Sequence, residues 1–366
     1  MTEIALRFTD LGRYSLYDRI LFFTEPSLVQ APDNTVRYEP QQKIRSVAIY
    51  GDQVDYDTTY HANNLGFIDE IDYDPTAPAT KTVAFIGDSF TVGDGGNQSW
   101  FSQLRAQAGQ PALALYNFGV TGTGILHFQQ LLASLKNSIA FDEINIMVIG
   151  NDFFRPFWIP VVREEGMWFC PPEQKKECLE NNPPIIQIAD QDDSQEDLLA
   201  RAKKLYALDN QGKNPSVNGL QRSRLYTLIC DAYRLRNHTE SLQTLCPHLK
   251  VSQANEYDKN DLYQKSLASL QEIKNSFPGV TIRVVHIPEK GETFNKQYSL
   301  DPKDDIEPMG LQYISLLDVC HWDSAMYHKH DPHFNETGYA NLADCVSQNV
   351  LKSDTGVHDS GNVNQN

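Results

Sequence analysis

Residues 83–90 read Val-Ala-Phe-Ile-Gly-Asp-Ser-Phe, an apolar run that is broken by Gly-Asp-Ser. The run predicts a buried strand, and the glycine turn predicts that a helix begins directly after it. Such a strand exposes the hydroxyl of Ser89 at the edge of a sheet, where the free N–H groups of the helix point at the same spot. This position suits an acyl-transfer nucleophile, although Gly-Asp-Ser also fits an ordinary turn followed by a helix N-cap.

Two further segments could supply hydrogen-bond donors beside this serine. The segment Asn-Phe-Gly-Val-Thr-Gly at 117–122 follows a second apolar run, and Gly119 and Gly122 would let backbone N–H groups approach a ligand closely. A third apolar run, 144–149, ends in Gly-Asn-Asp, which places the Asn151 amide at the carboxyl end of another strand. Ligands collect at that edge in open α/β sheets. Taken singly, each residue also fits a turn or a helix cap.

Residues 330–335 read His-Asp-Pro-His-Phe-Asn and precede a helical pattern over 336–351. His333, with Asp331 two positions upstream, offers an imidazole base and a carboxylate that could orient it. Four histidines gather in this region and could also be considered as metal ligands: His321, His328, His330 and His333. No Cys or Glu stands at a recognised ligand spacing from them, so we expect neither a metal nor another cofactor.

Taken in chain order, these segments resemble the four sequence blocks of the SGNH hydrolase superfamily, also called GDSL-type esterases. The resemblance is spread over residues 83–345. It implies a role for each of five residues: Ser89 as nucleophile, Gly122 as backbone donor of an oxyanion hole, Asn151 as its side-chain donor, His333 as general base and Asp331 as the partner of that base. The N–H of Ser89 would be a further oxyanion donor, and Gly119 is the alternative to Gly122.

The spacing Asp331-Pro332-His333 departs from the Asp-x-x-His that is common in this superfamily. The shorter form is similar to that of members that handle O-acetyl groups of polysaccharides. The segment at 60–67 likewise resembles the Asn-x-x-Gly-Phe of envelope-associated members. The resemblance thus implies a serine esterase that hydrolyses short acyl esters, most of all O-acetyl groups of an extracytoplasmic glycan, through an acyl-serine intermediate. An O-acyltransferase with the same site and an inactive glycan-binding module are the alternatives.

Strand and helix patterns alternate along the chain, with strands expected near 82–87, 112–117, 143–149, 281–287 and 313–318. Alternation of this kind predicts an α/β fold with a central parallel sheet in a three-layer α/β/α architecture. The resemblance implies that the strand order is flavodoxin-like.

The domain organisation that we expect has three parts: an N-terminal extension packing on the core over 1–80, an SGNH hydrolase domain over 81–352 and a disordered tail over 353–366. Within the hydrolase domain, the interval 153–278 is too long for a connection and predicts a mainly helical insertion. Helical patterns cover 195–208 and 219–247. The aromatic start of the insertion, 153–158, fits either a pocket wall or a small hydrophobic cluster under a loop.

The chain of 366 residues carries 31 Lys and Arg against 48 Asp and Glu, a formal net charge of −17. Nucleic acid and anionic membrane surfaces are poor partners for such a charge, so we expect an acylated small molecule or glycan instead. No run reaches the roughly 18 apolar residues that a membrane span needs. Residues 4–8, Ile-Ala-Leu-Arg-Phe, resemble the last turn of the N-terminal anchor helix of envelope-facing members. We therefore expect a periplasmic or extracellular protein, with an anchor or signal segment ahead of these residues.

Six cysteines are present, an even number that fits an oxidising compartment without requiring one. If all are joined they allow fifteen pairings. The pairs that would tie neighbouring segments together are Cys170 with Cys178, Cys230 with Cys246, and Cys320 with Cys345.

Overall fold

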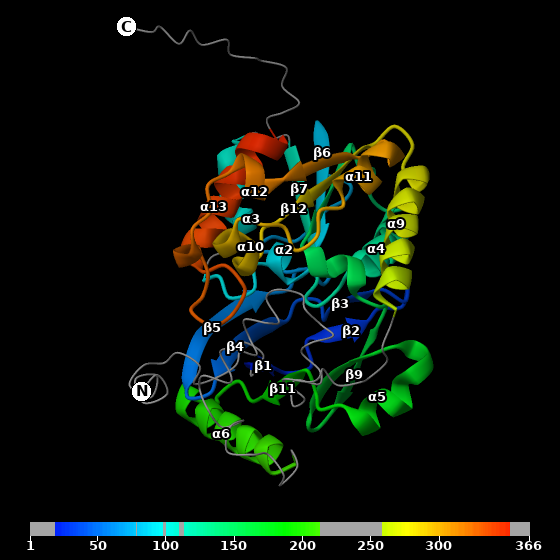
Figure 1. The fold of residues 1–366 in the computed structure, drawn as a ribbon. Helices are drawn as coiled ribbons and strands as arrows, with labels where there is room; N and C mark the ends of the chain where they lie inside the picture. The colour runs from blue at the N-terminus through cyan, green and yellow to red at the C-terminus, as the bar shows by residue number, and fades with distance from the viewer. Residues whose placement is uncertain (1–18, 78, 98–99, 110–112, 213–257, 352–366) are drawn as a thin grey trace, which may run out of the picture.

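The computed structural model describes residues 19–77, 79–97, 100–109, 113–212 and 258–351. These residues form two layers of sheet structure, one above the other in the view of Figure 1. The upper part is a parallel sheet between helices, and the lower part is a mixed sheet that lies against the carboxyl ends of the parallel strands.

The five strands of the parallel sheet are β6 (Lys81–Gly87), β7 (Leu113–Gly119), β8 (Glu143–Val148), β12 (Thr281–His286) and β13 (Gln312–Ser315). Their spatial order is β7-β6-β8-β12-β13, and every neighbouring pair is parallel. Numbered along the chain this is 2-1-3-4-5, the flavodoxin-like order. The predicted α/β fold with a central parallel sheet is therefore confirmed.

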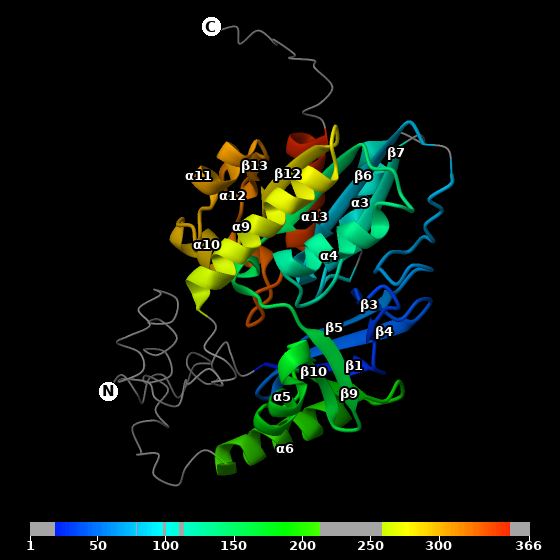
Figure 2. The same cartoon turned by 90° about the vertical axis from the view of Figure 1, so that its right-hand side faces the viewer.

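Helices cover both faces of this sheet, as Figures 1 and 2 show. On one face, α3 (Trp100–Ala108) packs against α13 (Glu336–Val346), and on the other α4 (Ile125–Leu135) packs against α9 (Lys259–Ser276). The strands between them are largely buried; every residue of the central strand β8, for example, is buried. Such strands belong to the middle layer of a three-layer structure.

The mixed sheet has the order β5-β4-β1-β11-β10-β9. Its strands come from two distant parts of the chain: β1 (Arg19–Thr24), β4 (Lys43–Tyr50) and β5 (Gln53–His61) precede the parallel sheet, whereas β9 (Ile159–Arg163), β10 (Gly166–Cys170) and β11 (Ile186–Ala189) lie in the insertion. Strand β1 joins them, because it pairs antiparallel with β4 and parallel with β11. The extension and the insertion, which the sequence presents as separate additions, thus share one sheet.

A short hairpin, β2 (Leu28–Gln30) with β3 (Val36–Tyr38), branches from the N-terminal part. We refer to β1–β5 as the N-terminal strands. Their buried side chains belong to the same hydrophobic core as those of the parallel sheet; Phe23 and Ile86 are both members of it. The two sheets are therefore packed together through a continuous core.

In the described part of the insertion, the α-helices are α5 (Lys175–Asn181), α6 (Gln195–Gly212) and α9 (Lys259–Ser276), which forms its C-terminal end. Helix α6 confirms the pattern predicted at 195–208, whereas the pattern at 219–247 lies outside the described residues. The strand predicted at 313–318 is wrong in its second half, because β13 stops at Ser315 and a short helix, α12 (Leu316–Val319), follows. The short apolar run could not distinguish the two.

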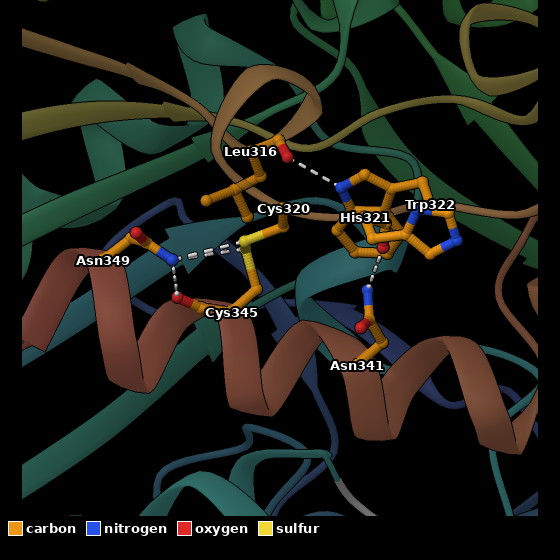
Figure 3. Close-up of a disulfide and its surroundings, with 7 residues drawn as sticks. All are labelled: Leu316, Cys320, His321, Trp322, Asn341, Cys345 and Asn349. Atoms are coloured by element: carbon orange, nitrogen blue, oxygen red, sulfur yellow. Dashed lines mark hydrogen bonds between the residues drawn. A yellow bond between two sulfur atoms is a disulfide. The ribbon is translucent and has the colours of Figure 1, made fainter. Parts of the chain in front are cut away.

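Two predicted disulfides are present, Cys170–Cys178 and Cys320–Cys345. Cys230 and Cys246 lie outside the described residues, as do residues 1–18 and the tail from 353. Figure 3 shows that Cys320–Cys345 ties the loop after α12 to the C-terminal end of α13. Within the described part of the chain, no helix combines the length and apolar character that crossing a membrane requires.

Candidate active site

Ser89 lies at the start of a short helix, α2 (Ser89–Val92), directly after β6. Asp88 caps this helix, because its side chain accepts the N–H of Phe90 at 2.9 Å. Gly87 makes the turn possible: a Cβ there would lie 2.6 Å from the carbonyl oxygen of Met147 on the neighbouring strand. The local sequence thus fixes the Ser89 hydroxyl at the carboxyl edge of the sheet, next to the point where the strand order reverses.

His333 and Asp331 are brought to this serine from the loop that precedes α13. The Nε2 atom of His333 lies 2.8 Å from the Oγ of Ser89, and its Nδ1 is hydrogen-bonded to Oδ1 of Asp331. The same carboxylate oxygen accepts the backbone N–H of His333 at 3.0 Å. With the ring proton on Nδ1 facing the carboxylate, Nε2 is free to accept the proton of the serine hydroxyl.

The charges in this group stabilise one another. Burial alone would raise the pKa of Asp331, but the charges of His333 and Arg19 and the hydrogen bonds from His333 hold it well below its usual range. Burial would likewise lower the pKa of His333, yet the attraction and hydrogen bond of Asp331 raise it above the ordinary imidazole value. Asp331 is therefore ionised, and His333 is a stronger base than a histidine in water.

The N-terminal strands supply three further side chains around Asp331 that the sequence did not reveal. Arg19 from β1 and Tyr50 from β4 each donate to Oδ2 of Asp331, at 3.0 Å. Asp55 from β5 accepts the backbone N–H groups of His330 and Asp331, at 3.0 and 2.7 Å. Nothing in the local sequence around these residues marks them, because each contact joins segments that are far apart in the chain.

The two glycines that could supply the backbone donor of the oxyanion hole differ in whether their N–H is already hydrogen-bonded. The N–H of Gly119 already donates to Oδ1 of Asn117 at 2.9 Å. Gly122 has φ +77°, in the left-handed region that favours glycine, and its carbonyl accepts the indole N–H of Trp158 at 2.9 Å. A Cβ on Gly122 would lie 2.6 Å from the ring of Phe169. The occupied N–H of Gly119 leaves Gly122 as the better candidate for a backbone donor.

Thr121, directly before Gly122, is held from two sides. The Tyr38 hydroxyl donates to its Oγ1 at 2.8 Å and accepts its N–H at 3.3 Å. The Oγ1 of Thr121 donates in turn to Oδ2 of Asp94 at 2.6 Å. Burial raises the pKa of Asp94 to about 6, although the charge of His333 opposes the shift. Tyr38 and Asp94, like Arg19, Tyr50 and Asp55, are residues that the sequence did not reveal.

Asn151 follows β8 in a short 3₁₀ helix, η1 (Gly150–Phe154), and its side chain is exposed. Its neighbour Asp152 is buried and pairs with Arg155 at 2.7 Å. Arg155 also donates to Asp88, the cap of the serine helix, at 2.9 Å. The loop that carries Asn151 is thereby tied to the turn that carries Ser89, and the oxyanion role of Asn151 stays a prediction.

The aromatic segment at 153–158 packs mostly inward. Phe153 and Trp158 are buried in the core, and Trp158 stacks on Phe169 at a centroid distance of 3.8 Å above the Gly122 turn. Among the described residues, no group of three or more His, Cys, Asp or Glu side chains is placed to hold a metal ion. One of the four histidines near the C-terminus, His328, instead donates a hydrogen bond from Nε2 to the carbonyl oxygen of Gly95 at 3.0 Å.

A polar groove of about 540 Å³ lies behind the loop that carries Asp331 and His333. It runs between β5, the loop after α2 and the start of α13. Its walls include carboxylates, amides and two aromatic rings: Asp55, Tyr56, Gln195, His328, Asn335 and Glu336.

Residues 83–346 match the family model described as GDSL-like lipase/acylhydrolase. No curated protein sequence matches the chain significantly. Among solved structures, the psychrotrophic esterase EstA from Pseudoalteromonas sp. is similar with a TM-score of 0.36 and 10 % identity, over 75 % of this chain and 98 % of that one. A family 3 carbohydrate esterase of Clostridium thermocellum gives 0.33 and 13 %, over 73 % and 94 %. A two-domain esterase active on acetylated mannans gives 0.31 and 11 %, over 75 % and 50 %. Likeness at these TM-scores does not identify a substrate.

Proposed function

Because this chain belongs to the GDSL-like lipase/acylhydrolase family, we propose that it hydrolyses short acyl esters, most of all O-acetyl groups of an extracytoplasmic glycan, through an acyl-serine intermediate. The observation that carries the proposal is the unbroken line of contacts from Ser89 through His333 to Asp331. A serine hydroxyl is a poor nucleophile until a neighbouring base takes its proton, and here the base is already within hydrogen-bond distance.

In the proposed reaction, Nε2 of His333 removes the hydroxyl proton while Oγ of Ser89 forms a bond to the ester carbonyl carbon. The imidazolium that results is stabilised by the ionised Asp331. His333 then returns the proton to the alcohol oxygen as the carbon–oxygen bond of the ester breaks. A water molecule, deprotonated by the same imidazole, then attacks the acyl carbon. His333 returns this proton to Oγ of Ser89 as the bond between Oγ and the acyl carbon breaks, which releases the carboxylic acid and restores the serine.

The negative charge that develops on the carbonyl oxygen needs donors on the opposite side of the carbon. We assign these to the N–H groups of Ser89 and Gly122 and to the amide of Asn151. Losing one donor of this kind typically costs about 2.7–4 kcal/mol of barrier. Gly122 meets the requirement better than Gly119, because the N–H of Gly119 is already donated to the side chain of Asn117.

Two observations support a small acyl group on a polar alcohol. Ser89 is only 6 % exposed, which suits a short acyl chain better than a long one. The Asp331-Pro332-His333 spacing resembles that of superfamily members acting on polysaccharide acetyl groups. The two disulfides support the extracytoplasmic location, because such bonds persist where the surroundings are oxidising.

The test is release of p-nitrophenol from acetyl, butyryl and octanoyl esters near pH 8, followed by release of acetate from acetylated glycans. We expect activity that falls with chain length, covalent labelling by a fluorophosphonate, and loss of both in Ser89→Ala. Added sugar acceptors distinguish hydrolysis from transfer, since an acyltransferase would form an acylated acceptor in place of free acetate. A protein that neither hydrolyses any ester nor reacts with the fluorophosphonate would contradict the proposal and favour a glycan-binding module.

A further inference from the structure

Both halves of the active site are attached to the N-terminal strands. One half is the pair Asp331 and His333. The other is the oxyanion loop, which we define as residues 119–122. Side chains from β3 and β4 contact these halves through buried hydrogen bonds, and Arg19 of β1 does so through a partly buried one. None of these side chains takes part in the proposed proton transfers.

On the first half, the two oxygens of the Asp331 carboxylate have different hydrogen-bond partners. Oδ1 of Asp331 is used by His333, whereas Oδ2 accepts from Arg19 and from the hydroxyl of Tyr50. The carboxylate is fully buried, and a carboxylate held through only one oxygen could rotate about its last bond. Rotation would carry the imidazole with it, and a misplacement of about 1 Å in a reacting group can cost about 10²-fold in rate.

On the second half, one hydroxyl holds a loop. The Tyr38 hydroxyl contacts both the N–H and the Oγ1 of Thr121, the residue that precedes Gly122. Because Tyr38 is 2 % exposed, these hydrogen bonds form where water does not compete. The peptide between Thr121 and Gly122 carries the proposed oxyanion donor, so the Tyr38 hydroxyl fixes one end of the peptide that must point at the substrate.

We propose that Arg19, Tyr50 and Tyr38 are positioning residues of the reaction, which hold Asp331 on one side and the oxyanion loop on the other at the spacing that attack by Ser89 requires. The N-terminal strands are then a working part of the hydrolase domain. This inference rests on the proposed function, because the spacing matters only to a group that reacts with an ester.

The experiment removes the hydroxyls without removing the rings. Tyr50→Phe and Tyr38→Phe keep the packing of the buried aromatic side chains, and Arg19→Gln keeps donors while removing the charge. The matched control is Tyr116→Phe. Among the described residues, that hydroxyl donates to the carbonyl of Asp74, at 3.4 Å, and to none of the residues placed in the active site. We expect kcat on p-nitrophenyl acetate to fall about 10- to 100-fold in the first three variants, with KM within about twofold, and to be unchanged in the control.

A second measurement separates the two halves. The proton on Nδ1 of His333 gives a far-downfield NMR signal whose position depends on the hydrogen bond to Asp331. We expect this signal to move in Tyr50→Phe and Arg19→Gln and to stay in place in Tyr38→Phe. If the three residues had a purely structural role, all three variants would lower the thermal unfolding midpoint, and the NMR signal would not distinguish Tyr50→Phe and Arg19→Gln from Tyr38→Phe.

The outcomes are separable. Positioning is overturned if all three variants keep kcat within about twofold of the unchanged protein, or if kcat falls only in proportion to the folded fraction measured at the assay temperature. If the unchanged protein hydrolyses no ester, the proposed function fails instead, and the NMR signal still reports whether Tyr50 and Arg19 fix Asp331.

Discussion

The side-chain oxygen of Asn117 accepts the backbone N–H of Gly119 at a distance of 2.9 Å. This hydrogen bond, formed within one strand end, occupies the donor that an oxyanion would need at Gly119. It leaves the turn three residues further on, at Gly122, to supply the backbone N–H. The geometry of that turn yields the first prediction.

Gly122→Ala should lower kcat about 10²- to 10³-fold, a loss comparable with that of one oxyanion donor. The added Cβ would lie 2.6 Å from the ring of Phe169, and the φ of +77° is strained for alanine. Steady-state kinetics on p-nitrophenyl acetate would measure the loss. In the double variant with Phe169→Ala the clash is relieved but the strain remains, so we expect only partial recovery. Full activity of Gly122→Ala would contradict the prediction, because it would show that the clash and the strain do not displace this N–H from its working position.

Ser89→Ala and His333→Ala should each lower kcat by at least about 10⁴-fold. The double variant should be no less active than either single variant, because the two side chains act as one unit and removing either stops proton transfer. The unfolding midpoint of each variant, measured by circular dichroism, controls for misfolding. Additive losses in the double variant would contradict a shared step.

The acid limb of kcat/KM should lie above pH 6.5, the ordinary imidazole value, since Asp331 raises the pKa of His333 and only the neutral ring accepts a proton. Asp94 raises the same pKa of His333, whereas the charge of Arg19 opposes it. Asp94→Asn removes a negative charge and should therefore move the limb to lower pH.

The matched control for this shift is Glu289→Gln. Burial and the charge of Glu292 raise the pKa of Glu289 to about 7, yet His333 is not among the groups that act on it. We expect its pH profile to coincide with that of the unchanged protein. An acid limb that stays in place, or moves upward, in Asp94→Asn would show that Asp94 does not act on His333.

Replacing both members of Cys320–Cys345 by serine should lower the free energy of unfolding by about 2–4 kcal/mol, a typical value for a native disulfide. It should also lower kcat, because this bond anchors α13, the helix that follows His333 (Figure 3). The double serine variant of Cys170–Cys178 is the comparison: it should lose stability with little change in kcat. Urea unfolding and kinetics on the two variants measure both effects, and equal losses of kcat would contradict the distinction.

Patterns that repeat locally made part of this protein predictable. The parallel strands appear as apolar runs, and Ser89, Asp331 and His333 stand in short segments with recognisable chemistry. Arg19 and Tyr50 were not predictable, since a basic residue and a tyrosine at strand positions have many ordinary uses. Their partner, Asp331, lies 312 and 281 positions away.

The mixed sheet escaped prediction for the same reason. Strand β1 finds one neighbour in β4 and the other in β11, more than a hundred residues later in the chain. No periodicity within either segment records that pairing. The boundary between β13 and α12 was missed for a local reason, because a short apolar run fits both a strand and a helix.

The contact between Arg19 and Asp331 joins residues that are 312 positions apart in the order of synthesis. A ribosome adds the N-terminal strands and the Ser89 turn long before it reaches His333, so a growing polypeptide carries the nucleophile without its base until the loop before α13 has been made. A polypeptide extended only as far as the insertion therefore lacks the imidazole that activates Ser89.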